Sequence, residues 1–425
     1  MRILHLIDPA AAGGGPCTLG LVAAALSHSP QHRHDVLIIG TSAHLALAGR
    51  CGLEPLGRIG TPLNRPSLAR NAMRKFLRAY ESASNRYDLI HAWTPGCGAL
   101  AASVAGNRRV LTGPVIAPSG GRAEPLEIRR LQRCRVQLLC ASPAVRSVYE
   151  AAGLDSTRLE VLAPAVDRNV IVFEDRKRLR ARWGAKEKTF VVGLLGEPAR
   201  WVDARAAVNA VSRIALGPKE VTVVLHPDSA GRPIAQQWLA SLDMPDRLVV
   251  DEKIAEPWRI VPGLDAALFM STAMNASPSA FNSRKRKPTG LLRALLSPSA
   301  GPSRLPNILP VLWAMAARVP VIAETCDALH TIIDDGRTGL LFEPRDSNGA
   351  AERILQLYDD AGARKAISTA AVARIDRSYN PDQFAAGLGA AYAQCCSAEP
   401  PHKTVTGGRG LLSRTMLMRS SRTET

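Results

Sequence analysis

Two series of short apolar runs, each alternating with longer helix-like segments, constrain the fold of this chain most. The first series comprises RILHLI, DVLIIG, DLIHAW, RRVLTGPVI, VQLLCAS and LEVLAPAV, and the second TFVVGLLG, VTVVLHP, RLVVDE, LDAALFMS, VPVIAET and TGLLFEP. Strand-like runs that alternate with helical segments are typical of βαβ units and parallel sheets. The pattern therefore predicts two similar α/β domains in tandem, each with helices on both faces of its sheet.

The segments that interrupt this alternation divide the chain. A charged stretch, DRNVIVFEDRKRLRARWGAKEK, separates the two series, and a second segment rich in Ser, Pro and basic residues interrupts the second series. A long segment of this composition predicts a loop rather than a packed element. The expected divisions are an N-terminal Rossmann-like domain (1–167), a linker (168–187), a C-terminal Rossmann-like domain (188–375) with a basic loop (273–304), a helix that crosses back to the first domain (376–397), and a disordered basic tail (398–425).

The charge of the chain predicts anionic partners. There are 54 Lys and Arg residues against 37 Asp and Glu, a formal charge of +17, which favours nucleotides, phospholipid headgroups or nucleic acid. Base stacking on a nucleic acid needs aromatic side chains among the basic ones, and the basic loop has only Phe281 at its edge. Nucleic acid is therefore the least expected of the three.

The ends and the cysteines of the chain bear on its location. The first residues, MRILHLID, favour a buried strand over a signal peptide, and no run approaches the ~20 apolar residues of a membrane span. The eight cysteines include no CxxC pair and no zinc-like spacing, which indicates reduced thiols. We therefore expect a cytoplasmic protein without a metal site.

The segment SLARNAMRKFLRAYESASNR has a helical pattern with two distinct stripes. The apolar stripe consists of Leu68, Ala72, Phe76 and Tyr80, and the basic stripe of Arg70, Arg74 and Arg78. A solvated face over a packed stripe is the favoured interpretation. The alternative is peripheral contact with an anionic membrane, to which each basic residue would contribute about 1 kcal/mol.

Two features of the first series are candidates for ligand contact. Gly13, Gly14 and Gly15 lie between the first predicted strand and its helix, where bare backbone approaches a phosphate or a sugar closely, although a tight turn explains them equally well. His91 lies at the end of the strand in YDLIHAW, on the edge where doubly wound sheets bind ligands. A lone histidine is more often structural than functional. His91 is therefore either a structural residue or a catalytic one.

The segment LPNILPVLWAMAARVPVIAETCDALHTIIDDGRTGLLFEPRDSNGAAERILQLYDD resembles the signature region of the group-1 glycosyl transferases, which are retaining nucleotide-sugar enzymes. The match is close at Pro310, Met315, Gly336 and Gly339, and weaker matches continue in family order to about residue 395. The resemblance implies the GT-B architecture, in which two Rossmann-like domains face a central cleft. It also implies sugar transfer from a nucleotide-sugar substrate to an unknown acceptor, without a metal or another cofactor.

The chain departs from this family at charged positions. The two glutamates of the family, with seven residues between them, map onto Leu305 and Trp313, and the second of them typically holds the ribose hydroxyls of the donor. A buried polar group left without a partner costs about 1 to 3 kcal/mol. The basic pair that clamps the diphosphate maps onto Glu197 and Arg200, and a later glutamate maps onto Thr331.

Other groups are candidates to replace these contacts. The amides of Ile308 and Leu309 precede Pro310 at a helix N-terminus that would favour a phosphate, the basic stretch 284–287 is a candidate clamp, and Glu324 is a candidate carboxylate. The predicted catalytic residues are His91 and Glu324, and the predicted nucleotide-sugar contacts are Gly13, Gly14, Gly15, Arg200, Ile308, Leu309, Trp313 and Thr331. Two functions stay open: a glycosyl transferase, or a degenerate relative that binds a ligand or partner without catalysis.

Overall fold

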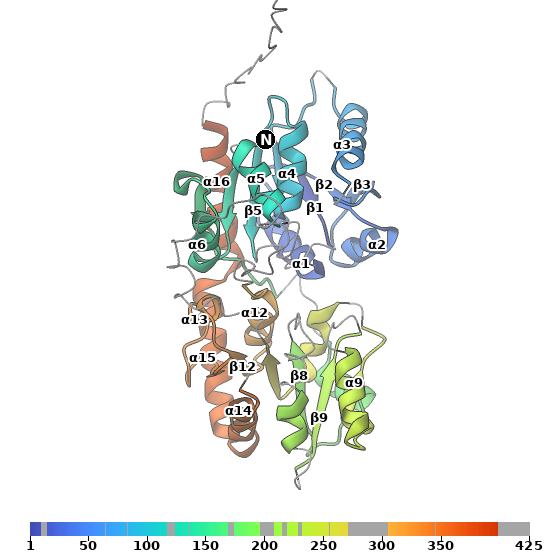
Figure 1. Cartoon of the computed structure of the whole chain (residues 1–425), viewed down its shortest axis with the longest axis vertical. Coiled ribbons are helices and arrows are strands. Elements are labelled where there is room, and N and C mark those ends of the chain that lie inside the picture. Colours follow the sequence, from blue (N-terminus) through green and yellow to red (C-terminus); the bar gives the residue numbers. More distant parts are fainter. Residues whose placement is uncertain are drawn as a thin grey trace, which may run out of the picture.

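The computed structural model consists of two α/β domains stacked end to end (Figure 1). It describes residues 1–9, 15–63, 65–82, 84–116, 124–134, 136–168, 174–195, 208–214, 219–227, 232–254, 256–270, 305–344 and 346–397. The predicted basic loop (273–304) and the predicted tail (398–425) lie outside these residues.

The N-terminal domain contains a seven-stranded parallel sheet in the order β3-β2-β1-β4-β5-β6-β7. Its strands are β1 (Arg2–Ile7), β2 (Arg33–Ile39), β3 (Pro55–Ile59), β4 (Leu89–Ala92), β5 (Arg109–Val115), β6 (Gln137–Cys140) and β7 (Leu159–Val161). Its helices are α1 (Gly15–Ser27), α2 (Ser42–Arg50), α3 (Pro66–Tyr80), α4 (Pro95–Val104), α5 (Glu124–Cys134) and α6 (Pro143–Ala151). The central strands are continuous aliphatic runs because both faces of the sheet are covered.

Capping residues fix where the helices leave this sheet. Thr94 accepts a hydrogen bond from the amide of Cys97 at the start of α4, and Ser142 does the same for Val145 at the start of α6. A proline follows each cap, where its missing N–H leaves no bond unmade. Both helices therefore begin directly after the carboxyl ends of β4 and β6.

The C-terminal domain contains a six-stranded parallel sheet in the order β10-β9-β8-β11-β12-β13. Its strands are β8 (Phe190–Leu195), β9 (Val221–Leu225), β10 (Leu248–Val250), β11 (Ala266–Phe269), β12 (Val321–Glu324) and β13 (Leu340–Phe342). The helices from here to the end are α7 (Arg176–Arg182), α9 (Arg232–Ser241), the 3-10 helix η3 (Pro257–Gly263), α12 (Leu309–Ala316), α13 (Asp327–His330), α14 (Ser347–Asp359), α15 (Ala361–Ser378) and α16 (Pro381–Ser397).

Both sheets have the strand order of a doubly wound fold, with the direction of winding reversed between β1 and β4 and between β8 and β11. The prediction of two Rossmann-like parallel sheets is confirmed. None of the described helices is long and apolar enough to cross a bilayer.

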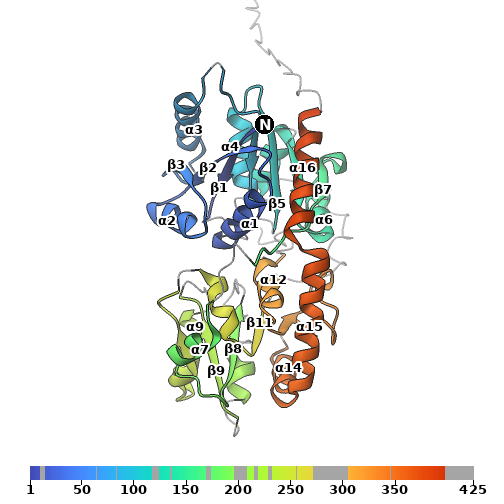
Figure 2. The ribbon, with the colours of Figure 1, turned by 180° about the vertical axis from the view of Figure 1, so that it is seen from behind.

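The last two helices join the domains. Helix α15 lies against α12 in the C-terminal domain, whereas α16 lies against α1 and β5 in the N-terminal domain, as the view from behind shows (Figure 2). At the crossing point the amide of Val166 donates to the carbonyl of Tyr379 over 3.1 Å. Nearby, the ring of His28 lies 2.9 Å from carboxylate oxygens of both Asp167 and Asp382. His28, the residue after α1, therefore joins Asp167, between the two domains, to Asp382 of α16.

Candidate functional site

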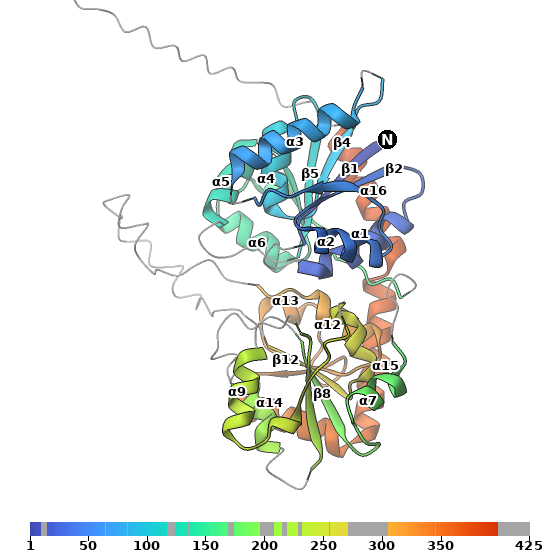
Figure 3. The ribbon, with the colours of Figure 1, turned by 90° about the vertical axis from the view of Figure 1, so that its right-hand side faces the viewer.

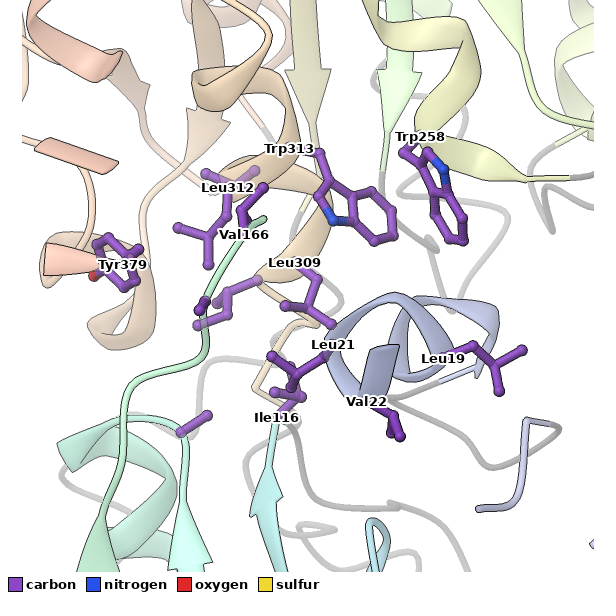
Figure 4. Packing of buried hydrophobic residues seen from close by; sticks show 14 of the residues in the cluster. Leu19, Leu21, Val22, Ile116, Val166, Trp258, Leu309, Leu312, Trp313 and Tyr379 are labelled. Carbon is purple, nitrogen blue, oxygen red and sulfur yellow. The ribbon is translucent and has the colours of Figure 1, made fainter. Parts of the chain in front are cut away.

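The carboxyl edges of the two sheets meet through apolar side chains (Figure 4). Helix α1 follows β1, helix α12 precedes β12, and a single cluster of buried residues includes members of both. In the close view, Leu309 of α12 lies beside Leu21 of α1, with Ile116 from the end of β5 next to them. This edge is where doubly wound folds bind ligands, so we take it as the candidate site.

Trp313 occupies the centre of this contact. Its side chain is 2% exposed, and its ring meets that of Trp258 in a T-shaped arrangement, with centroids 5.0 Å apart and an interplanar angle of 66°. Trp258 in turn lies against α1, because a Cβ at Gly20 would stand 4.0 Å from its ring. Two indoles thus fill the space between α12 and α1 that a carboxylate would otherwise face.

The N-terminus of α12 offers few donors to a ligand. All eight residues of α12 are buried, and the amide of Leu309 already donates to Asn307 Oδ1 over 3.0 Å. Pro310 has no amide hydrogen, and Ile308 is the N-cap without a side-chain cap bond. Two amides were predicted to bind a phosphate. That of Leu309 is already used in the bond to Asn307, and that of Ile308 is the other.

An ion pair links the two domains two residues before Trp258 in the sequence. Nε of Arg50, at the end of α2, lies 2.8 Å from Oε1 of Glu256, at the start of η3, and so links the two domains. The Glu256 side chain is 5% exposed and also lies 3.3 Å from Arg259. Burial, together with the charge of Glu256, raises the pKa of the neighbouring Cys51 thiol to about 12. This thiol is therefore inert at neutral pH.

The comparisons with known proteins agree with this geometry. The family model for group 1 glycosyl transferases matches residues 292–360, which include α12, β12, α13 and β13. The D-inositol 3-phosphate glycosyltransferase of Salinispora arenicola is 27% identical over 362 residues, which cover 77% of this chain and 73% of the relative. That of Paenarthrobacter aurescens is 25% identical over 298 residues, or 66% of each chain.

The chain is similar to the group 1 glycosyl transferases, most clearly over residues 292–360.

Solved structures show the same fold. The structure of HepE from Anabaena in complex with UDP and glucose superposes with a TM-score of 0.69 at 19% identity, over 93% of this chain and 100% of that one. Sucrose-phosphate synthase from Thermosynechococcus elongatus superposes with a TM-score of 0.64 at 17% identity, over 94% of this chain and 100% of that one. The predicted GT-B architecture is confirmed.

Two predicted residues lie on the β12 side of the site. Glu324 is the last residue of β12 and its side chain is 3% exposed. Thr331 follows α13 and is exposed, but its hydroxyl donates to the carbonyl of Ala328 over 2.7 Å, and its own carbonyl accepts from Arg374 over 2.6 Å. Glu324 thus stands at the edge that faces the first domain, and its catalytic role stays a prediction.

His91 lies inside the N-terminal domain, with 0% exposure. Its Nε2 donates to the carbonyl of Gly113, so its Nδ1 accepts from the hydroxyl of Tyr392 on α16, 2.8 Å away. Burial lowers the pKa of His91 to about 3. Both ring nitrogens are bonded within the protein, and this geometry gives the predicted catalytic role no support.

A second chain of bonds runs beside His91. The indole of Trp93 donates to Nδ1 of His5 over 3.1 Å, Nε2 of His5 lies 2.9 Å from Nδ1 of His34, and Nε2 of His34 lies 2.9 Å from the carbonyl of Ser29. Because an indole only donates and a carbonyl only accepts, both histidines are neutral and every proton has a defined place. Burial first, and then the charges of His91 and His34, lower the pKa of His5 well below its ordinary value. The histidines of this sheet therefore stabilise the core.

Several predicted contacts lie outside the described residues: Gly13, Gly14, Glu197, Arg200 and the basic stretch 284–287. Gly15 is the first residue of α1. In the described part of the chain, no group of three or more His, Cys, Asp or Glu side chains is arranged to hold a metal ion.

The sequence reasoning missed Trp258 and Glu256, which the structure places beside Trp313 and Arg50. Neither belongs to a recognisable motif, and η3 is a 3-10 helix without a regular apolar period. Their position depends on how the two domains meet, which no local pattern indicates.

A separate cavity of about 940 Å³ lies beside β13. Its walls carry five carboxylates against two arginines, namely Asp334, Asp335, Glu343, Asp346 and Glu352 against Arg353 and Arg374. An excess of negative charge repels a diphosphate, so the charge of this cavity does not suit a nucleotide sugar.

Proposed function

We propose that this protein transfers a sugar from a nucleotide-sugar donor to an acceptor, with the donor bound between the two domains. The observation that carries the proposal is the position of the family-matched segment. It forms α12, β12 and α13 on the edge of the C-terminal sheet that faces the first domain. The names of the relatives, and the UDP-glucose complex of the Anabaena protein, support a nucleotide-sugar donor.

Donor binding in this site has to differ from the usual arrangement in the family. Trp313 offers an indole where a carboxylate would accept the ribose hydroxyls, and its contact with Trp258 closes the space between α12 and α1. We therefore propose that the domains separate to admit the donor, and that Glu324 supplies the nearest carboxylate. Sugar transfer is proposed to need no metal, so activity should persist after dialysis against EDTA.

Thermal-shift screening tests the donor proposal directly. The protein is melted with UDP-, GDP- and ADP-sugars and with the free nucleotides, because a ligand that binds only the folded state raises Tm. One nucleotide sugar should raise Tm, and the same compound should yield a transferred or hydrolysed sugar. A melting temperature unchanged by every donor at millimolar concentration would contradict the proposal. Glu324→Gln, compared with Thr331→Val, separates the proposed carboxylate from a neighbouring group whose hydroxyl is already bonded.

A second function is favoured by the contact of Trp313 with Trp258. If the indoles stay in place, the protein keeps the framework of a transferase and binds a ligand or partner without catalysis. Nucleotide-dependent stabilisation without any sugar product would favour this binding function over transfer.

We also propose that the protein makes peripheral contact with an anionic membrane through α3. On α3, the side chains of Arg74, Lys75 and Arg78 are exposed and the helix has no acidic residue in its first turn. Leu68 and Tyr80 on the same helix are 51% and 41% exposed. Cosedimentation with phosphatidylglycerol vesicles, but not with phosphatidylcholine vesicles, is the expected result, and equal binding to both would exclude an electrostatic contact.

A further inference from the structure

A second cavity, of about 230 Å³, lies in the N-terminal domain on the outer side of α4. Figure 3 shows α3, α4 and α5 side by side on this face, with α4 between the other two. Helix α4 contributes the floor, with Gly96, Ala99 and Ser103, whereas α3 and α5 contribute the walls. The small residues of α4 leave room for a ligand, because they fill little of the space between the outer helices.

The walls of this cavity carry three arginines, which are Arg70 from α3 and Arg130 and Arg133 from α5. Nε of Arg70 is buried and has no hydrogen-bond partner among the described residues. Arg130 and Arg133 likewise make no ion pair in the part of the chain that the structure describes. Three arginines therefore line a space in which the described residues give them no ion-pair partner.

One carboxylate approaches this region from α5. A Cβ at Gly96 would stand 3.2 Å from Oε1 of Glu127, so that carboxylate lies at the start of α4, at one end of the cavity. It is not among the residues that line the cavity. Three positive groups thus remain on the walls, against one negative group at the end.

A buried guanidinium nitrogen without a partner is costly, and proteins satisfy such groups with an acceptor. Guanidinium groups match the paired oxygens of a phosphate and bind them through short, charge-assisted hydrogen bonds. A cavity of about 230 Å³ is far larger than a single water needs and accommodates a phosphate group.

We propose that the cavity between α3, α4 and α5 binds a phosphate group, held by Arg70, Arg130 and Arg133. This site lies apart from the contact between α12 and α1, and its occupation does not depend on sugar transfer. The phosphate belongs either to a lipid headgroup, which the exposed basic face of α3 would bring close, or to a soluble phosphorylated compound.

The test is isothermal titration calorimetry of the full-length protein with inorganic phosphate at constant ionic strength. Arg70→Gln and Arg130→Gln should each weaken phosphate binding about tenfold, since each removes a charge-assisted bond. Arg74→Gln and Arg129→Gln are the matched controls, because they make the same charge change on α3 and α5 outside the cavity lining; they should change the affinity less than twofold. Equal losses in all four variants, or no saturable binding to the wild type, would overturn the proposal.

Two further experiments control for misfolding and identify the source of the phosphate. If Arg70→Gln does not fold, as judged by circular dichroism, Arg133→Gln replaces it, because Arg133 is exposed at the rim of the cavity. Vesicles of phosphatidic acid in phosphatidylcholine identify the source of the phosphate. Vesicle binding that falls with Arg70→Gln but not with Arg74→Gln assigns the site to a lipid headgroup. Vesicle binding that is the same in both variants, with weakened binding of glycerol 3-phosphate in Arg70→Gln alone, assigns it to a soluble compound.

Discussion

The ring of Trp313 on α12 meets the ring of Trp258 on η3 edge to face, with centroids 5.0 Å apart, and the Trp258 ring lies against Gly20 of α1. An aromatic pair of this geometry contributes about 0.5 to 1.5 kcal/mol beyond the area it buries. Both indoles belong to the C-terminal domain, so this energy stabilises that domain, and Trp258 carries the contact to α1 of the first domain.

A double-mutant cycle on the two indoles should therefore reveal coupling. Trp313→Ala and Trp258→Ala should each lower the free energy of unfolding by about 3 to 5 kcal/mol, and the double variant should lose less than their sum. Urea unfolding measures all three. Trp313→Ala combined with Met73→Ala is the control, because Met73 belongs to a separate cluster in the first domain. Additivity in both pairs would mean that the indoles do not act together.

The bond between Arg50 and Glu256 should contribute more than an ordinary surface ion pair. The Glu256 side chain is 5% exposed, so Arg50→Ala leaves a buried carboxylate with fewer partners and should cost about 1 to 2 kcal/mol in unfolding free energy. Arg146→Ala removes a pair of which both side chains are partly exposed on α6 and should cost less than about 0.5 kcal/mol. Similar losses in the two variants would refute a stabilising role at the domain contact.

The buried histidine His91 should make the protein less stable in acid. Its pKa is lowered to about 3 by burial, whereas the unfolded chain binds a proton near the ordinary value. Its contribution is fully present above about pH 6.5 and is lost as pH falls, by about 1.4 kcal/mol for each pH unit between the two pKa values. Urea midpoints between pH 7 and pH 4 should fall less steeply in His91→Gln than in the wild type, whereas the exposed His330→Gln should keep the wild-type slope.

The contribution of His28 to stability should have the opposite pH dependence, because its pKa is raised. Burial opposes its charged form, but the hydrogen bonds and charges of Asp167 and Asp382 outweigh burial and raise its pKa. A raised histidine pKa gives stability that is fully present below the unfolded value of about 6.5 and is lost as pH rises through the folded value. Melting temperatures across this range should show that His28→Gln destabilises the protein at pH 6 and has little effect at pH 9. An equal effect at both values would exclude an ionic role.

Helix α4 should tolerate no larger residue where it crosses β5. A Cβ at Gly98 would stand 2.2 Å from the hydroxyl of Thr112, so Gly98→Ala should destabilise the protein by about 1 to 3 kcal/mol through overpacking. Gly389 in α16 has nothing within 4 Å of such a Cβ, and Gly389→Ala should instead stabilise by about 0.5 to 1 kcal/mol. Calorimetric melting of both variants checks the sign of each effect.

Most of the strands were predictable because buried parallel strands are continuous aliphatic runs. The runs RILHLI and TFVVGLLG correspond to β1 and β8, at the centres of the two sheets. The segment matched by the family model was equally accessible, since Pro310 and Gly336 mark a helix start and a positive-φ turn. These strands, the helix start and the turn all depend on residues that are close together in the sequence.

The candidate site was less predictable because it depends on contacts distant in sequence. The surroundings of His91 come from Gly113 and from Tyr392, which lies 301 residues away. The period of the strand gives the face on which His91 lies, but not which helix covers that face. The contact of Trp313 with Trp258 has the same character, since it arises only when α12, η3 and α1 are assembled.

The return of α16 to the N-terminal domain has a consequence for the order in which the protein is made. The first domain lacks the cover over β5 and His91 until residues 381–397 have been synthesised, because Tyr392 and its neighbours supply that cover. Synthesis proceeds from the N-terminus, and domains made early generally fold first. Here the first domain made is the last to be completed, because β5 lacks this cover from its own synthesis until α16 has been made.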